Sequence, residues 1–191
     1  MKRNRKPNRL GNYNYASDRL YFVTSCVQNR ICCFGEIVGT GRDDVGTGRD
    51  LSLPKMVLNE FGKIAEKQWF WLVEQYPYIA SHAFVVMPNH IHGIIEIDRY
   101  RIIGDDYGTD RNGVGTGRDL SLRMKIKSLS ELMGAYKTSV SKQIHLLGLL
   151  DFAWQRSFYD HIIRNGYSFN LICDCIRNNP AKWEQDSFFI G

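Results

Sequence analysis

The stretch of residues 83–97 constrains the fold of this chain more than any other. It consists of two apolar runs separated by Pro88 and Asn89. Proline cannot donate a hydrogen bond to a central sheet ladder, and asparagine favours turns, so these two residues predict a turn between buried strands. Strands joined by so short a connection pair antiparallel. The stretch therefore predicts a β-hairpin in the core.

Two histidines, His90 and His92, stand at the start of the second run. Because side chains alternate along a strand, both imidazoles share one face and Ile91 points to the other. Their spacing along the strand is roughly 6.5–7 Å, which lets both converge on one metal ion. The alternative is a pair of half-exposed histidines at a sheet edge. The apolar residues on either side favour the metal site.

Helical patterns flank the hairpin. Residues 58–76 carry apolar side chains at helical spacing, with Asn59 near the start and Pro77 after the end. Ser128 and Glu131 form a capping-box pattern that opens a helix reaching about Leu147. A third helix is predicted over 168–178, and strands over 20–27, 78–86, 91–97 and part of 152–163.

The predicted order is β-α-β-β-α-β-α. It indicates an α+β, ferredoxin-like sandwich with an antiparallel sheet and helices on one face.

The length of 191 residues fits a single domain, 1–191, that begins with a basic arm over 1–19. Two Gly-rich segments, at about 38–55 and 104–124, carry one identical sequence, Val45–Leu53 and Val114–Leu122. Their flanks do not resemble each other, so they are not stacking repeats. We interpret both as insertions into surface loops.

The formal net charge is +5, which favours a polyanionic partner. Basic residues without any acid open the chain, and two lysines lie off the apolar stripe of the second helix. These candidate DNA contacts are Arg3, Arg5, Lys6, Arg9, Lys137 and Lys142. A solvated tail and a solvated helix face are the alternatives. We expect no membrane span, because no apolar run is long enough, and the five cysteines without framework spacing predict a reducing cytoplasm.

A metal at the histidine pair needs further ligands, and the last predicted helix offers them. Cys175 and Asn179 are four residues apart and share one helix face. Two imidazoles and one amide oxygen leave open positions, which suits Mg²⁺ or Mn²⁺ acting on a phosphate. The rival is a zinc site that adds Cys173 and Cys175. Residues two apart on a helix face different ways, so the rival is disfavoured.

The segment Met87-Pro-Asn-His-Ile-His-Gly-Ile-Ile95 resembles the histidine-hydrophobe-histidine motif of HUH-type single-strand nucleases. Further blocks are similar to the REP-associated tyrosine transposases, and together they span nearly the whole chain except the insertions. These blocks are Arg19–Thr24, Leu58–Gly62, Trp154–Arg156, Asp160–Asn165 and Asn178–Trp183. Arg156, inside one block, joins the candidate DNA contacts.

The resemblance implies the ferredoxin-like fold and a partner, single-stranded or hairpin DNA at repetitive palindromes, at the nucleoid. It implies a metal-assisted cleavage in which a tyrosine forms a 5′-phosphotyrosine link, releases a 3′-hydroxyl and later rejoins the strand. Such a protein needs no nucleotide cofactor, and either a monomer or a homodimer is compatible with the sequence. Asn179 matches the position that completes the family's metal site.

The chain departs from the family at the nucleophile. The tyrosine is expected four residues before Asn179, where this sequence has Cys175. A thiolate is a soft nucleophile poorly matched to phosphorus, and its side chain is shorter. Tyr159 is a possible substitute, with Tyr167 and Tyr136 as further options. The sequence thus leaves three hypotheses: an active transposase-like enzyme, an inactive module that binds repeat hairpins, and an unrelated RNA-binding module.

Overall fold

The computed structural model describes residues 13–39, 53–102 and 125–189. Its main sheet has the strand order β4-β5-β1-β6, and every neighbouring pair is antiparallel. The strands are β1 (Arg19–Cys26), β4 (Ile79–Met87), β5 (His90–Ile97) and β6 (Tyr159–Ile163). The helices are α1 (Glu60–Gln75), α2 (Leu129–Leu146) and α3 (Gly166–Asn178). The predicted α+β, ferredoxin-like arrangement is confirmed, including the central β4–β5 hairpin.

Smaller elements complete the described chain. Strands β2 (Gly35–Val38) and β3 (Lys55–Leu58) form a separate two-stranded sheet. Short 3-10 helices are η1 (Gln28–Arg30), η2 (Arg99–Ile102) and η4 (Pro180–Gln185). Most of the first predicted insertion, all of the second, and the basic residues Arg3, Arg5, Lys6 and Arg9 lie outside the described residues. Among the helices that are described, none has the length and hydropathy needed to cross a bilayer.

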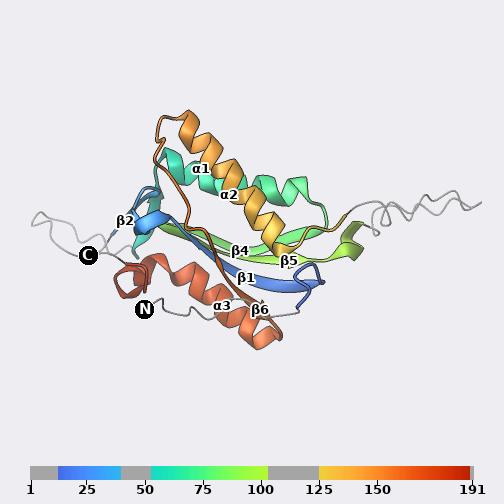
Figure 1. Cartoon of the computed structure of the whole chain (residues 1–191). Helices are drawn as coiled ribbons and strands as arrows, with labels where there is room; N and C mark the ends of the chain where they lie inside the picture. Colours follow the sequence, from blue (N-terminus) through green and yellow to red (C-terminus); the bar gives the residue numbers. More distant parts are fainter. Residues whose placement is uncertain (1–12, 40–52, 103–124, 190–191) are drawn as a thin grey trace, which may run out of the picture.

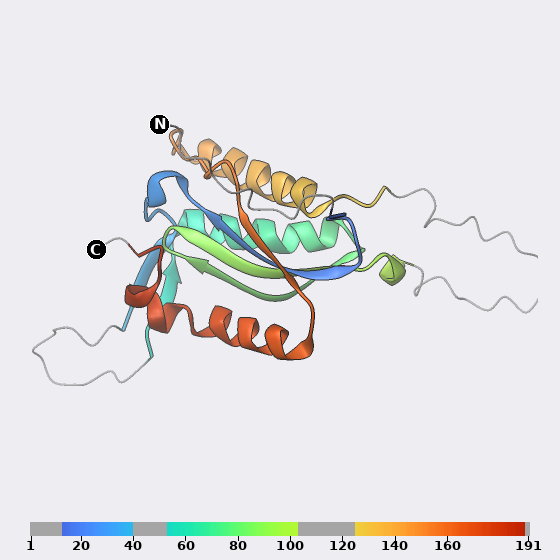
Figure 2. The same ribbon diagram turned by 60° about the horizontal axis from the view of Figure 1, so that its bottom comes forward.

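The sheet separates two layers of helices. Helices α1 and α2 cover one face, and α3 lies along the other (Figure 1, Figure 2). The larger core packs under α1 and α2, whereas a smaller cluster formed by Ile94, Ile163, Cys173 and Ile176 packs under α3. The prediction that the helices share one face is therefore wrong for α3. Its apolar stripe covers the side of the sheet that α1 and α2 leave open, mainly at β4 and β5.

Polar caps fix where the helices begin, as the sequence predicts. The Asn59 side chain accepts hydrogen bonds from the amides of Phe61 and Gly62 at the start of α1. Ser128 and Glu131 form the predicted capping box at α2. Each such cap satisfies amides that the first helical turn leaves without a partner. Asn165 caps α3 in the same way.

The glycine after the histidine pair lets α1 approach the sheet closely. A Cβ at Gly93 would lie 2.4 Å from two ring carbons of Trp69. The Trp69 ring stacks on Phe84, with 4.4 Å between the ring centroids, and is fully buried. Helix α1 therefore supports β5 from behind, directly beneath the strand that carries the histidines.

The segment before β6 is not a strand, although the sequence allowed one to begin at residue 152. Only Tyr159–Ile163 is regular. Residues 153–155 cross the end of β1, where the amide of Gln28 donates to the carbonyl of Ala153 at 2.7 Å and the amide of Gln155 donates to the carbonyl of Cys26 at 2.8 Å. The chain thereby passes from the α2 layer round the end of β1 to the sheet edge.

Candidate metal centre and nucleic-acid interface

Strand β5 holds both histidines on the face of the sheet that α3 covers. Cross-strand pairs place His92 beside Thr24 and Val85, and His90 beside Cys26 and Met87. His90 is 0% and His92 7% exposed. The alternative of two half-exposed histidines at a sheet edge is therefore wrong, since β5 is an inner strand.

The two imidazoles point their Nε2 atoms at each other, 3.0 Å apart. The Nδ1 atom of His90 lies 2.8 Å from Asn89 Oδ1. The Asn89 amide nitrogen donates to the carbonyls of Arg30 and Phe188, so its orientation is fixed and its oxygen faces His90. An amide oxygen only accepts, so His90 carries its proton on Nδ1 and leaves a lone pair on Nε2.

A second partner orients the other ring. Thr24 Oγ1 lies 2.7 Å from His92 Nδ1. Phe22 stacks on the same imidazole, with 5.4 Å between the ring centroids. Both histidines therefore have one nitrogen engaged by the protein and the other directed at a common point. This is the arrangement found around metal-binding histidines.

Burial keeps both imidazoles neutral. It lowers the pKa of His90 to about 2, assisted by repulsion from His92 and Arg30. Burial also lowers the pKa of His92 to about 4, opposed in part by attraction to Asp186. At neutral pH both rings are therefore in the form that offers a lone pair to a metal.

Asp186 brings a carboxylate to the pair. Its Oδ2 lies 3.7 Å from His90 Nε2, and its side chain is 9% exposed. One ligand atom from each of His90, His92 and Asp186 lies within 4.8 Å of the others. The other carboxylate oxygen, Oδ1, accepts a hydrogen bond from the amide of Phe188. The sequence prediction missed Asp186, since the only available signal was an acid a few residues beyond Asn178-Asn179-Pro180.

Asn179, the predicted third ligand, lies at the junction of α3 and η4. Its Oδ1 is buried and has no hydrogen-bond partner among the described residues. Buried acceptors without partners are rare in proteins, and a cation or a donor from a ligand would satisfy this one. Asn179 therefore remains a predicted ligand.

The two cysteines of α3 differ in their surroundings. Cys175 is exposed on α3, whereas Cys173 is buried beneath the helix. The two thiols face different ways, and neither belongs to the cluster of His90, His92 and Asp186. Within the described chain, the rival zinc site with two cysteines therefore has no support.

Tyr159 lies on the same sheet face as His92. It pairs with Thr24 across β1 and β6, and Thr24 pairs with His92 across β1 and β5. Tyr159 is 51% exposed, and its ring contacts Phe22, with 6.3 Å between the centroids. The half-exposed phenol of Tyr159 thus lies two strands away from the histidines, and the ring of Phe22 contacts both Tyr159 and His92.

The other two tyrosines are placed differently. Tyr136 is fully buried, and its hydroxyl donates to the carbonyl of Ala65, so it belongs to the core. Tyr167 is 80% exposed near the start of α3. Tyr159 is therefore the tyrosine that the structure relates to the histidine pair through shared neighbours.

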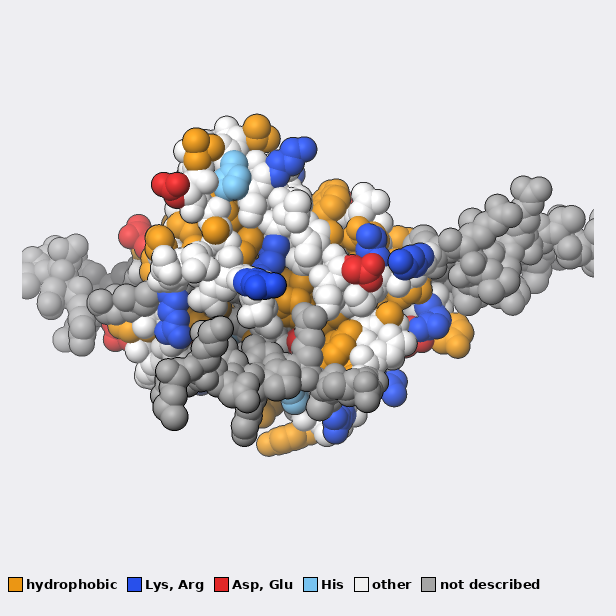
Figure 3. All heavy atoms as spheres, in the orientation of Figure 1, with side chains coloured by type: hydrophobic (Ala, Val, Ile, Leu, Met, Phe, Trp, Pro, Cys, Tyr) orange, Lys and Arg blue, Asp and Glu red, His pale blue; other side chains and the backbone are white. Residues whose placement is uncertain are grey.

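The predicted DNA-contacting residues differ in their exposure and in their hydrogen-bond partners. The ammonium of Lys137 donates to the carbonyls of Gln155 and Ser157, at 2.7 and 3.3 Å, and so anchors the segment before β6. Lys142 and Arg156 are exposed. Figure 3 shows Lys and Arg side chains spread over the face that Figure 1 views, with fewer acidic ones among them. Contact with DNA remains a prediction for all three residues.

A comparison with known protein sequences identifies one relative of this chain. No family model matches the chain. A Haemophilus influenzae protein, described only as uncharacterized, is 31% identical over 195 aligned positions that cover 97% of this chain and 93% of that protein. The chain belongs to the same family as this Haemophilus protein.

A solved structure shares the fold. The chain superposes on a REP-associated tyrosine transposase bound to a REP hairpin with a TM-score of 0.52 and 18% identity. The match covers 92% of this chain and 73% of the transposase. The resemblance that the sequence blocks indicate is thereby confirmed at the level of the fold.

Proposed function

We propose that this chain is a DNA-binding, transposase-like protein that holds a divalent cation at His90 and His92 beside a phosphate of single-stranded or hairpin DNA. The observation that carries the proposal is the pair of buried Nε2 atoms, 3.0 Å apart, with the carboxylate of Asp186 next to them. The shared fold with a hairpin-bound transposase supports DNA as the partner. A DNA partner in turn implies a protein that works in the cytoplasm, at the nucleoid.

The donor set fits a cation. Two metal–nitrogen bonds of roughly 2.0–2.1 Å that meet at a right angle separate their nitrogens by roughly 2.9 Å. The separation of the two Nε2 atoms is 3.0 Å. Two imidazoles with a carboxylate and an amide oxygen form a mixed nitrogen and oxygen set, which suits Mn²⁺ or Mg²⁺ better than a closed thiolate zinc site.

Each residue of the site has a distinct task. His90 and His92 offer lone pairs, Thr24 and Asn89 hold the rings in position, and Asp186 balances the charge of a cation. Asn179 would add its unpartnered oxygen. A bound divalent ion would supply Lewis-acid polarisation of the scissile phosphate. Because these side chains are buried, a phosphate at the site would interact with them in a surrounding of low dielectric constant, where charges act strongly.

Strand cleavage would need a nucleophile. A phenolate oxygen that attacks phosphorus forms a new P–O bond, breaks the bond to the 3′-oxygen and releases a 3′-hydroxyl after proton uptake. Tyr159 could supply this oxygen from the same sheet face. Cys175, at the position of the family's tyrosine, would attack through sulfur, which is poorly suited to phosphorus.

The replacement of that tyrosine by Cys175 favours a second candidate function. A module with the same metal and DNA sites could bind repeat hairpins without cutting them. Both candidates share the binding chemistry and differ only in the covalent step.

A single assay tests the proposal and separates the candidates. The protein is incubated with a labelled DNA hairpin and Mn²⁺, and binding and covalent adducts are measured in parallel. Absence of hairpin binding would refute the proposal. Binding with an adduct that Tyr159→Phe abolishes and Cys175→Ala retains assigns the tyrosine, and the reverse assigns the cysteine. Binding without an adduct identifies the non-cutting module.

A further inference from the structure

The turn that follows β1 has a backbone conformation that most side chains avoid. Asn29 and Arg30 have φ angles of 56° and 58°, in the left-handed region. Asparagine tolerates this region, whereas a long side chain is strained there. Backbone strain of this kind often accompanies a functional role, and Arg30 lies beside the candidate metal centre.

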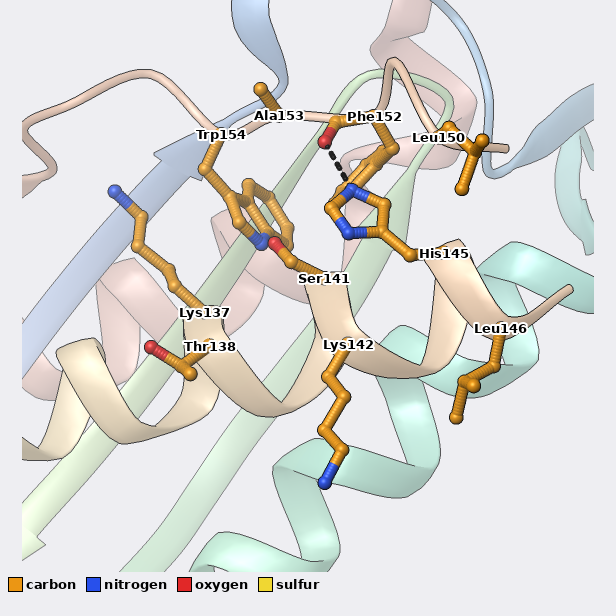
Figure 4. Close-up of a pocket in the computed structure, with 10 residues that line it drawn as sticks. All are labelled: Lys137, Thr138, Ser141, Lys142, His145, Leu146, Leu150, Phe152, Ala153 and Trp154. Atoms are coloured by element: carbon orange, nitrogen blue, oxygen red, sulfur yellow. Dashed lines mark hydrogen bonds between the residues drawn. The ribbon is translucent and has the colours of Figure 1, made fainter. Parts of the chain in front are cut away.

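The α2 layer holds this turn in place from behind. The amide of Gln28, which opens the turn, donates to the carbonyl of Ala153 at 2.7 Å. The preceding carbonyl, that of Phe152, lies 2.9 Å from Nε2 of His145 on α2, and Figure 4 draws this hydrogen bond as a dashed line. The turn is therefore anchored to the rigid part of the fold.

The strained backbone directs the carbonyl of Arg30 at the histidine pair. This carbonyl accepts a hydrogen bond from the Asn89 amide nitrogen at 3.0 Å, and Asn89 Oδ1 lies 2.8 Å from His90 Nδ1. A glycine at position 30 would adopt the same backbone without strain, because it has no Cβ. The side chain of Arg30 can therefore be removed while its backbone contact stays.

The side chain of Arg30 extends over the same site. Its Nη1 donates to the carbonyl of Ser187 at 2.9 Å, and its guanidinium carbon lies 5.3 Å from the centre of the Phe188 ring. The centre of the Phe188 ring is in turn 4.7 Å from the centre of the His90 ring. One aromatic ring thus lies against both the guanidinium and an imidazole of the metal centre.

The guanidinium keeps most of its hydrogen-bonding capacity. Only one of its N–H groups is used, by the carbonyl of Ser187. Arg30 is exposed, and no carboxylate of the described residues forms an ion pair with it. After burial and repulsion from His92, the charge of Arg30 is the third cause that lowers the pKa of His90. A positive charge at this place disfavours a cation at the histidines unless an anion lies between them.

A phosphodiester of DNA supplies such an anion. Its charge lies on the non-bridging oxygens, so one oxygen can bind the cation while the other accepts hydrogen bonds from a guanidinium. The planar fork of arginine matches phosphate geometry, and such charge-assisted hydrogen bonds are strong.

We propose that Arg30 binds the same DNA phosphate as the cation at His90 and His92, and that this shared phosphate makes the cation and the DNA bind cooperatively. The inference rests on the proposed function and gives the phosphate a protein ligand that the metal cluster lacks. Because coupling between two ligands is reciprocal, Mn²⁺ tightens hairpin binding by the same factor as the hairpin tightens Mn²⁺ binding.

Titration of Mn²⁺ with and without a DNA hairpin measures this coupling on the full chain. In the parent, the hairpin should raise the affinity for Mn²⁺ roughly 10- to 100-fold. Arg30→Gly should lower this factor at least about fivefold. Its affinity for Mn²⁺ without DNA should stay equal or rise, because a repelling charge is removed.

Two further variants make the comparison specific. Arg30→Lys keeps the charge but not the planar fork, so it should retain only part of the coupling. Arg101→Gln removes the same charge beyond the far end of β5, in η2, and should keep the coupling factor of the parent. If Arg30 only supports the cluster structurally, Arg30→Gly instead weakens Mn²⁺ binding in the absence of DNA, and that result would overturn the proposal.

A second measurement locates the phosphate. Hairpins with a neutral methylphosphonate at single positions are titrated in the presence of Mn²⁺. At one position the replacement should weaken binding to the parent at least about fivefold more than binding to Arg30→Gly, since the variant has already lost the contact.

The outcomes distinguish this inference from the proposed function. Unchanged coupling in Arg30→Gly, or equal methylphosphonate effects in both proteins at every position, would overturn the role of Arg30 and leave metal and DNA binding in place. Inorganic phosphate that raises the Mn²⁺ affinity as strongly as the hairpin would overturn the DNA contact in favour of a free anion. A parent that binds neither Mn²⁺ nor the hairpin would remove the proposed function and this inference together.

Discussion

The buried histidine pair makes the metal-free protein sensitive to mild acid. In the unfolded chain a histidine has a pKa of 6.5, whereas folding lowers the pKa of His90 to about 2 and of His92 to about 4. Between pH 6.5 and about 4 the unfolded state therefore binds protons that the folded state cannot take. Stability rises with pH wherever the unfolded state binds more protons, so it is lost as the pH falls through this window.

The magnitude at pH 5.0 is set by the pKa of the unfolded rings, because both folded pKa values lie below 5.0. At pH 5.0 the unfolded ring is 1.5 pH units below its pKa of 6.5, and each unit corresponds to roughly 1.4 kcal/mol. Each histidine then lowers the free energy of unfolding by about 2 kcal/mol between pH 7.5 and 5.0, and the pair by about 4 kcal/mol. That is a large share of the roughly 5–15 kcal/mol that stabilises a typical domain.

Urea unfolding in a chelating buffer at pH 7.5 and 5.0 measures the effect. The His90→Gln variant should lose about 2 kcal/mol of the pH dependence, because glutamine does not titrate. His82→Gln is the matched control, since His82 is only partly buried and pairs with Glu96 at 2.8 Å. If His90→Gln and the parent have the same pH dependence, the imidazole is not held neutral and the reasoning fails.

Three further predictions follow from single contacts. Gly93→Ala should destabilise the protein by about 1–3 kcal/mol in urea unfolding, because its Cβ would meet the Trp69 ring. Gly134→Ala, in α2 with nothing within 4 Å, should instead stabilise it by about 0.5–1 kcal/mol; the same sign for both would contradict the packing account. Thr24→Val should weaken Mn²⁺ binding roughly 10- to 100-fold in a titration, as His92 loses its partner, whereas the exposed Thr138→Val should have no effect. Cys175→Tyr should yield a covalent adduct with single-stranded hairpin DNA on a denaturing gel, and its absence would mean that Cys175 does not occupy the attacking position.

The fold was largely predictable because its signals are local. The caps at Asn59 and Ser128, the turn at Pro88 and the alternation around His90 each depend on residues a few positions apart. The placement of α3 was not predictable, because the sequence of an amphipathic helix does not indicate which face of the sheet it will cover. The aromatic run from residue 152 was similarly ambiguous. It turned out to divide into a crossing segment and a short strand.

Of the three residues in the metal-binding cluster, only the two histidines were predictable from the sequence. His90 and His92 are neighbours on one strand, so their convergence follows from alternation. Asp186 reaches them from the far end of the chain, where η4 folds back, and a lone acid between Gln185 and Ser187 has no local pattern to mark it. The role of Gly93 was hidden for the same reason, because the ring that requires it belongs to Trp69 on another element.

Metal titration tests the central claim most directly. Mn²⁺ is added to the metal-free protein at pH 7.5, and the free ion is followed by electron paramagnetic resonance. The account predicts one site per chain that His90→Ala abolishes and Asp186→Asn weakens, with binding intact in the control His82→Ala. Binding that is absent from the parent, or that survives in His90→Ala unchanged, would contradict a cation site at the histidine pair.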